Sequence, residues 1–182
     1  MLVIGCSESD AQQKVITVTE TYGNAVPKII KTYKESNDKF ELVKSISLYE
    51  NGQKSSEDNY KDGKGDGKWT TWYENGQKWY EGYIKTINDT TAVWNGLKTQ
   101  WYVNGQKEKE MTFKDEKEDG LRIEYYENGQ KRLEGYFKDG KQDRFWTFWY
   151  ENGKKWKEGT FKDGETISHE CWDEDGNEEE CR

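Results

Sequence analysis

Runs rich in aromatic residues and Thr alternate along the chain with short polar stretches that contain Asn-Gly or Asp-Gly. In WTTWYENGQKWYEGYIK, residues 69–85, two such runs flank Asn75 and Gly76. Asn-Gly between two runs of this kind is a strong signal for a β-hairpin, because both central residues of a type I′ turn need a positive φ. Stretches with Asp and Gly, which also suit tight turns, join successive hairpins at 61–69, 114–122 and 138–146. The pattern predicts two β-strands per unit.

The Asn-Gly turn recurs at a regular distance. YENGQK stands at 49–54, 73–78 and 126–131, YVNGQK at 102–107, YENGKK at 150–155 and a weaker copy, WDEDGN, at 172–177. The turn glycines are separated by 24, 29, 24, 24 and 23 residues. They are Gly52, Gly76, Gly105, Gly129, Gly153 and Gly176. A fixed period above about 20 residues is typical of repeat proteins. The longer interval contains an insertion around 88–95, for which we expect a protruding loop.

Two other positions repeat with the same period. An apolar residue followed by Lys stands eleven residues after each turn-opening Tyr, and the pair Tyr22 and Tyr33 obeys the same rule. A Glu recurs at Glu57, Glu81, Glu110, Glu134 and Glu158. Because this Glu occurs once per repeat, we interpret it as a structural partner of the repeated Lys or of a turn N–H rather than as a catalytic carboxylate.

These patterns predict an all-β fold, an elongated, twisted antiparallel meander of repeated β-hairpins with little or no helix. We divide the chain into an N-terminal anchor segment and polar tether (1–20), a repeat array (21–176) and an acidic C-terminal tail (172–182). Within the array, 21–48 is a degenerate first repeat and 49–171 are full repeats.

The aromatic residues have a structural explanation in this fold. If Asn75 and Gly76 close a two-residue loop, Trp72 faces Trp79 and Trp69 faces Gly82. In the last full repeat the equivalent predicted pairs are Trp149 with Trp156 and Trp146 with Gly159. A large ring over a cross-strand glycine covers backbone that a single-layer sheet otherwise leaves bare. A three-residue loop would shift all these partners by one.

Composition and charge exclude some classes of function. Only 31% of the residues are hydrophobic but 15% are aromatic, and the formal net charge is −8. Disordered chains are poor in aromatic residues, so the composition favours a folded protein. A net negative charge argues against binding to nucleic acid, which needs clustered Lys and Arg, and against an anionic membrane surface.

YENGQKRLEGYFKDGKQD, residues 126–143, resembles the MORN-repeat variant, a hairpin unit with Tyr, Asn, Gly, Glu and a second Gly at set positions. The resemblance covers about 49–176 and more weakly 21–48, and it departs from the pattern at Asp58, Met111 and the insertion at 85–97. Bacterial proteins of this type are commonly identified as YwqK-like antitoxins of toxin–antitoxin systems. The resemblance therefore implies a non-catalytic protein that binds a toxin, and it implies no catalytic residues or cofactor.

The first residues, MLVIGCSESDAQQK, resemble a bacterial lipobox followed by a polar tether, with Cys6 as the residue that takes the lipid. An export signal needs about 15–30 residues with a basic start. Either the true start lies upstream or the match is a coincidence. We expect a lipid-anchored protein of the bacterial cell envelope that meets the membrane only through this anchor; the alternative is a cytoplasmic protein.

The remaining reactive residues lie near the C-terminus. Cys171 and Cys181 are ten residues apart and could form a disulfide in an exported protein. Together with His169 their spacing fits no zinc pattern, so we expect no metal site. His169 is the only histidine, and no nucleophile signature surrounds it. We expect no enzymatic activity and no cofactor.

Two hypotheses about function follow. The first is a non-catalytic repeat scaffold for protein–protein interaction, either an antitoxin or a surface lipoprotein whose partner is a toxin or an envelope protein. The second is a glycan- or cell-wall-binding module, because the aromatic hairpins are also similar to choline- and glucan-binding repeats. In both cases the expected contact residues are the rings around the turns: Trp69, Trp72, Trp79, Trp146, Trp149 and Trp156.

Overall fold

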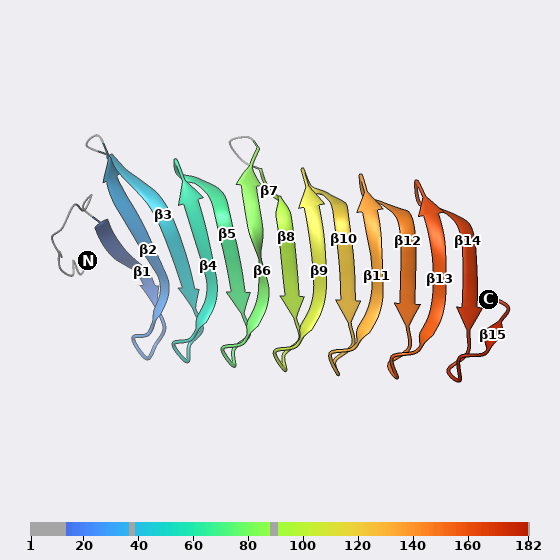
Figure 1. Ribbon diagram of the computed structural model, residues 1–182. Coiled ribbons are helices and arrows are strands. Elements are labelled where there is room, and N and C mark those ends of the chain that lie inside the picture. Colours follow the sequence, from blue (N-terminus) through green and yellow to red (C-terminus); the bar gives the residue numbers. More distant parts are fainter. Residues whose placement is uncertain (1–13, 37–38, 88–90, 182) are drawn as a thin grey trace. The chain divides into compact units, whose positions relative to one another are not determined.

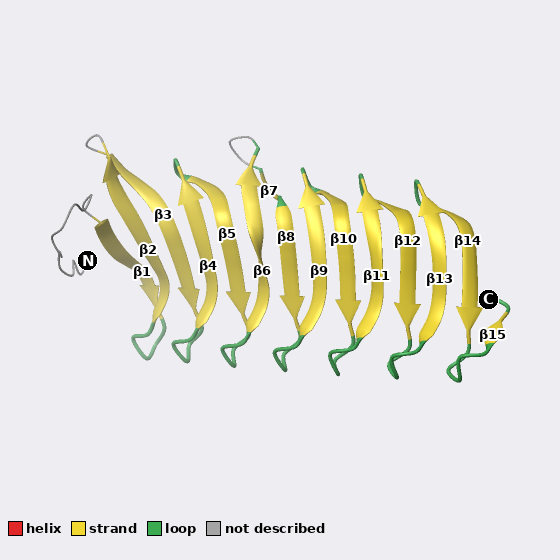
Figure 2. Ribbon diagram, viewed as in Figure 1, coloured by secondary structure: helices red, strands yellow, loops and turns green. Residues whose placement is uncertain are grey.

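The computed structural model describes residues 14–36, 39–87 and 91–181. In these ranges the chain forms fifteen β-strands and no helix (Figures 1 and 2). The described residues therefore include no helix of the length and apolarity that crossing a membrane requires. The strand pairs are antiparallel, and the predicted meander of hairpins is confirmed. Cys6 lies outside the described residues.

The chain divides into two compact units, with the boundary between Val93 and Trp94. The first unit contains β1 (Lys14–Thr21), β2 (Pro27–Ser36), β3 (Lys39–Leu48), β4 (Lys54–Lys61), β5 (Lys64–Trp72) and β6 (Lys78–Thr86). The second contains β8 (Gly96–Trp101), β9 (Lys107–Lys114), β10 (Lys117–Tyr125), β11 (Lys131–Lys138), β12 (Lys141–Trp149), β13 (Lys155–Lys162), β14 (Glu165–Trp172) and β15 (Glu178–Glu179). Within each unit successive strands lie side by side in chain order (Figure 1).

Two segments differ from the simplest repeat. The insertion contains a short strand, β7 (Ala92–Trp94), which pairs with β6. Strand β1 begins at Lys14 and pairs with β2, so residues 14–20, which we expected to lie in the tether, are part of the sheet.

The Asn-Gly turns are not type I′ turns. The Gly76 N–H donates to the Tyr73 carbonyl (2.9 Å), and the Tyr73 N–H donates to the Gln77 carbonyl (2.8 Å). Gly76 has a φ of 83°, and no other residue of this loop has a positive φ. The loop therefore has three residues. The two-residue turns with two positive φ angles lie at the other end of the strands, as at Asp139 (49°) and Gly140 (82°).

The three-residue loop changes the pairing close to the turn. Trp72 pairs with Lys78, and the predicted pair of Trp72 with Trp79 is wrong. Trp79 is the extra residue of a bulge in β6, and this bulge restores the register. Beyond it Trp69 pairs with Gly82, as predicted.

The last full repeat behaves in the same way. Trp149 pairs with Lys155 instead of Trp156, whereas Trp146 pairs with Gly159 as predicted. The longer loop and its compensating bulge are thus a property of the repeat.

Within each unit, an Asn-Gly turn is tied to the next turn by two side-chain hydrogen bonds. The Tyr126 hydroxyl donates to the Trp149 carbonyl (2.7 Å), and the Asn128 amide donates to the Glu151 carbonyl (3.1 Å). The Asn128 Oδ1 also accepts from the Gln130 N–H (2.9 Å) and so shapes its own turn. The Tyr bond recurs from Tyr22 to Leu48, Tyr49 to Trp72, Tyr102 to Tyr125 and Tyr150 to Trp172. The Tyr and Asn of the motif therefore hold successive hairpins together.

The turn glycine is required for two reasons. Gly129 has a φ of 83°, a conformation that strains any residue with a Cβ. A Cβ at Gly129 would also overlap the Gln106 Oε1, which lies against this glycine from the preceding turn. Gln130 lies in the same way against Gly153.

The repeated Glu is a structural residue, as we interpreted it. Each one accepts a hydrogen bond from the Lys three residues earlier, for example Lys54 Nζ to Glu57 Oε2 at 2.5 Å and Lys155 Nζ to Glu158 Oε2 at 2.6 Å. Hydrogen bonds from Lys44 and then Lys54 lower the pKa of Glu57, so this carboxylate is charged at neutral pH. Pairs this exposed contribute at most about 1 kcal/mol each.

Candidate binding surface

Successive residues of a strand point to opposite faces of the sheet. We call the face that carries Trp146 in the second unit the core face, and the opposite one, which carries the repeated Glu residues, the Glu face. The register places Trp146 opposite Gly159 on the core face, and Thr147 opposite Glu158 on the Glu face.

An aromatic cluster occupies one end of the core face. Trp146 is only 2% exposed, and its indole lies over Gly135, where a Cβ would overlap the ring. Its ring centroid lies 5.1 Å from that of Phe137, 5.9 Å from Phe148 and 6.0 Å from Phe161. A single-layer sheet buries a Trp here because aromatic rings surround it on its own face.

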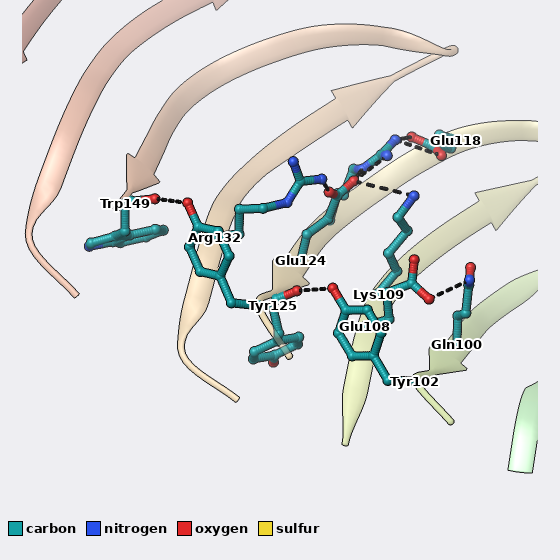
Figure 3. Close-up of polar contacts among 11 residues, drawn as sticks. Gln100, Tyr102, Glu108, Lys109, Glu118, Glu124, Tyr125, Arg132 and Trp149 are labelled. Carbon is teal, nitrogen blue, oxygen red and sulfur yellow. Dashed lines mark hydrogen bonds and ion pairs between the residues drawn. The ribbon is translucent and has the colours of Figure 1, made fainter. Parts of the chain in front are cut away.

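An ionic cluster occupies the neighbouring strands of the same face (Figure 3). Glu124 is 2% exposed. It accepts hydrogen bonds from Arg122, whose Nε lies 2.8 Å from Glu124 Oε1, and from Arg132, and Lys109 Nζ lies 4.0 Å away. The second partner of Arg122 is Glu118, at 2.9 and 3.1 Å. A buried carboxylate is tolerated only with such partners, because an unpaired buried charge costs several kcal/mol.

The two clusters use the same positions of successive repeats. Counted from the turn-opening Tyr, Arg122 and Trp146 stand four residues before it, Glu124 and Phe148 two residues before it, and Arg132 and Trp156 six residues after it. In the repeat that precedes them these positions hold Lys98, Gln100 and Glu108. The framework of the turn is constant, whereas the side chains on the core face change completely from one repeat to the next.

The repeat that contains Lys98, Gln100 and Glu108 is polar on the core face. Gln100 Nε2 donates to Glu108 Oε2 at 2.6 Å (Figure 3). Lys98 Nζ lies 4.3 Å from the centroid of the Trp94 ring. Burial lowers the pKa of Lys98.

The six Trp residues expected to form a contact surface do not share one environment. Trp146 is buried, so it serves as core and does not offer a contact surface. Trp79 and Trp156 are 41% and 36% exposed. The Trp156 ring lies 5.4 Å from Phe148, on the core face. Trp69 is half-buried opposite Gly82.

Trp72 and Trp149 lie on the Glu face instead. Lys54 Nζ lies 5.4 Å above the Trp72 ring and Lys131 Nζ lies 5.9 Å above the Trp149 ring, each from the preceding turn. Trp72 also lines an open hollow of about 340 Å³ with Gln53. The expected residues are thus distributed over both faces, and Trp156 is the one in the second unit that is exposed on the core face.

The sequence pattern did not single out Arg122, Glu124 and Arg132. They stand at the same distances from the turn Tyr as Trp146, Phe148 and Trp156, so the period of the chain could have identified these three positions. The residue types could not have shown that the positions form a buried ionic cluster, because Arg and Glu are common on exposed strands.

Tyr125 is another residue that the sequence did not single out. Its hydroxyl donates to Glu110 Oε2 at 2.8 Å on the Glu face. Burial, followed by this hydrogen bond, raises the pKa of Tyr125 to about 12. Burial alone would raise the pKa of Glu110, but hydrogen bonds from Lys107 and Tyr125 outweigh it and lower that pKa.

The C-terminal segment is attached to the sheet by a disulfide. Cys171 and Cys181 are bonded, with 5.3 Å between their Cα atoms, and β15 pairs with the end of β14. Among the described residues no group of three or more His, Cys, Asp or Glu side chains could hold a metal ion.

Four segments of the chain match a known family of repeats: residues 44–62, 65–85, 118–139 and 146–163. The family is the MORN repeat variant. The resemblance of the sequence to MORN repeats is confirmed over these segments. No curated protein matches the chain. The hydrogen bonds that join successive turns in these segments also occur outside them, at Tyr22 and Tyr102.

Proposed function

We propose that the protein is a non-catalytic scaffold of MORN repeats that binds a protein partner on the core face of its second unit. The observation that supports this most is the contrast between a constant framework and variable core-face positions. Repeat proteins use their stacked units as extended binding surfaces, whose specificity resides in the variable positions.

The exposed residues on this face belong to types that dominate protein interfaces. Trp and Arg are enriched among the residues that contribute most to binding. Trp156 is 36% exposed and the Arg132 side chain is 46% exposed, and they occupy the same position in neighbouring repeats. A partner that covers both would bury an aromatic ring next to a guanidinium.

The same positions argue for a protein rather than a glycan. A regular polysaccharide would be bound best by the same ring in every repeat. In the second unit the position of Trp156 holds Glu108 and Arg132 in the two preceding repeats. Such a mixed row suits the irregular side chains of a polypeptide.

The finer predictions from the sequence are part of this proposal. An antitoxin would bind its toxin through this face, and a lipid on Cys6 would place the scaffold at the cell envelope. Both stay predictions.

A photo-crosslinking amino acid at position 156, compared with one at Leu121, tests the proposal. Leu121 is 45% exposed and lies in β10 one residue from Arg122, so it projects from the Glu face. We expect the probe at 156 to capture one protein in the native host and the probe at 121 to capture none. Trp156→Ala should weaken that complex about tenfold, a loss typical of a substantial interface contact. Equal capture from both positions, or retention on cell-wall polysaccharide with no protein captured, would contradict the proposal.

A further inference from the structure

Strand β1 is an open edge of the first unit. It pairs with β2 on one side, and no strand of the described residues pairs with it on the other side. In an antiparallel ladder every second residue of an edge strand points its N–H and C=O away from the neighbouring strand. These backbone groups of β1 therefore offer hydrogen bonds to a further strand.

The residues of β1 favour such pairing. The five residues from Val15 to Thr19 are all β-branched, and no charged residue or proline lies between Lys14 and Glu20. Ile16 and Val18 are 49% and 48% exposed and, as alternate residues, lie on one face of the strand. Proteins usually protect an edge strand with charges, proline or a covering segment, and an exposed apolar edge is a site of pairing with another chain.

The C-terminal edge of the second unit, formed by β14 and β15, is protected in these ways. Glu165 and Glu170 place charges on β14, Ile167 is the extra residue of a bulge, and β15 covers the end of the strand. The disulfide between Cys171 and Cys181 holds β15 there. One edge strand is protected and the other is open, which favours a closed pair of copies joined through β1 over an open-ended assembly.

A second copy of β1 fits this edge in the antiparallel direction. The strand pairs regularly with β2 from Lys14 to Val18 and bulges after Val18. All five regular residues find a partner when a two-fold axis passes through Ile16, which then lies opposite its own copy. Lys14 lies opposite Val18 of the copy, and Val15 opposite Thr17. Cross-strand pairs of β-branched residues stabilise a sheet, and the aliphatic part of a lysine covers an apolar neighbour.

The charges at the ends of β1 favour the antiparallel over the parallel direction. Lys14 is opposite Lys34 of β2, and the residue opposite Lys34 on its other side is Glu41 of β3. Lys14 therefore has a like-charged neighbour in its own chain. An antiparallel copy brings Glu20 to this end of the strand, whereas a parallel copy would bring a second Lys14.

Glu20 is able to accept this lysine. Its side chain is 62% exposed, and its ion pair with Lys28 is 3.7 Å long. This distance is beyond that of a hydrogen bond, so the carboxylate keeps its capacity to accept one. Elsewhere in the chain a carboxylate accepts from two lysines, as Glu57 does at 2.7 and 2.5 Å. Lys14 of a second copy can therefore join Lys28 at Glu20.

We infer that β1 pairs in the antiparallel direction with β1 of a second copy, with a two-fold axis at Ile16. Two first units thereby form a closed dimer through one continuous sheet. The pairing surface precedes the first matched repeat, which begins at residue 44. The inference goes beyond the proposed function and does not depend on it, because the surface proposed there lies in the second unit.

Sedimentation equilibrium of the full chain tests the dimer, with Cys6→Ser in every chain to prevent a disulfide between copies. We expect a monomer–dimer equilibrium. Ile16→Lys should weaken the dimer at least tenfold, because it sets two lysines opposite each other at the two-fold axis. Ile167→Lys, the same substitution at a 62% exposed residue of β14, is the matched control and should leave the equilibrium unchanged. A monomer at every concentration, assemblies larger than a dimer, or equal weakening by the two variants would overturn the inference.

Charge variants test the direction of pairing. Lys14→Glu and Glu20→Lys each bring like charges together at both ends of the antiparallel pair, so each variant alone should dimerise at least tenfold more weakly. A mixture of the two restores opposite charges at both ends, and we expect a heterodimer about as stable as the unmodified dimer. A mixture that associates no better than either variant alone would refute the antiparallel pairing.

A cysteine at the axis tests the register. In the Ile16→Cys variant the new thiol lies opposite that of the copy, and Cα atoms of directly opposite residues are about 4.5–5.5 Å apart, which allows a disulfide. Thr17→Cys is the control, because residue 17 lies opposite Val15. With oxidised glutathione as the oxidant, we expect a covalent dimer from Ile16→Cys and little from Thr17→Cys. Equal yields from the two variants, or none from Ile16→Cys, would contradict the inference.

Discussion

Two neighbouring repeats of the second unit, residues 118–139 and 146–163, share their turns and differ in what they bury. Tyr126 and Tyr150 each donate to a carbonyl in the following repeat, at 2.7 and 2.9 Å. Between these equal frameworks one repeat buries Glu124 and the other buries Trp146, each 2% exposed. The ionic cluster and the aromatic cluster fit the same backbone, so the turn framework alone does not determine which side chains occupy the core face.

The comparison separates two roles in the repeat. Tyr, Asn, Gly and the Lys–Glu pair make contacts that recur with the period of the chain, and they stabilise the array. The core-face positions are filled by a buried ionic cluster in one repeat and by a buried aromatic cluster in the other. Positions that tolerate such opposite chemistry can carry specificity for a partner without loss of the fold.

Trp146→Ala breaks the aromatic repeat and should have the largest effect. It removes a fully buried ring that contacts three Phe residues and covers Gly135, so we expect unfolding to become easier by about 3–5 kcal/mol. Chemical denaturation measures this loss. Trp156→Ala, an exposed ring of the same face, is the control and should cost much less. Equal losses would mean that the aromatic cluster is not the core of this repeat.

Glu124→Gln breaks the ionic repeat. It leaves Arg122 and Arg132 without their buried counter-charge, and we expect a loss of about 3 kcal/mol, at the lower end for a buried ion pair because Arg132 is half exposed. Glu127→Gln, in the exposed turn of the same repeat, should leave the denaturation midpoint unchanged. A loss below that of a surface ion pair would show that Glu124 is not effectively buried.

Tyr126→Phe tests the framework that the two repeats share. The variant removes the hydroxyl that donates to the Trp149 carbonyl and should cost about 1 kcal/mol, the net value of one hydrogen bond. Tyr83→Phe, at a residue that is 53% exposed, is the matched control. Identical midpoints for the two variants would argue against a tie between successive turns.

The smallest expected difference between the two repeats is in how their stability depends on pH above about 10. Tyr125 and Trp149 occupy the same position of the two repeats, and only Tyr125 titrates. Its pKa is raised from about 10 to about 12, so between these pH values the folded state holds a proton that the unfolded state has lost. Stability therefore falls as pH rises through this range. Tyr125→Phe should lose less stability than the unmodified chain over the same range; parallel pH profiles would contradict the raised pKa.

The fold could be predicted from the sequence because the turn motif recurs many times with one period. The pairs beyond the bulge, Trp69 with Gly82 and Trp146 with Gly159, were predicted correctly. The pair of Trp72 with Trp79 was not, because YENGQK is compatible with a two- or a three-residue loop. The choice depends on which backbone N–H groups close the turn, and residue types alone do not specify it.

The candidate surface could be predicted only in part. Exposed aromatic residues near the turns were expected, and Trp156 is one of them. The burial of Trp146 could not be derived, since it depends on rings from three different strands that approach one side. The network around Glu124 could not be derived either, because its members are separated in sequence and look like ordinary surface charges.

The central claim is that the turn framework holds the fold while the variable core-face residues of the second unit, among them Arg132 and Trp156, provide the binding chemistry. The most direct test replaces the ionic core-face residues of the repeat 118–139 by the aromatic residues that stand at the same positions of the repeat 146–163. The substitutions are Arg122→Trp, Glu124→Phe and Arg132→Trp. Met111→Gly is added because Met111 lies opposite Arg122 on the preceding strand, where the other repeat has Gly135 beneath its Trp. Replacing a buried ionic network by packed apolar residues is often neutral or stabilising by about 1–4 kcal/mol. We expect the four-substitution chain to unfold at the same denaturant concentration or higher and to bind the protein captured at position 156 at least tenfold more weakly. A chain that unfolds, or one that folds and binds this protein with unchanged affinity, would contradict the claim.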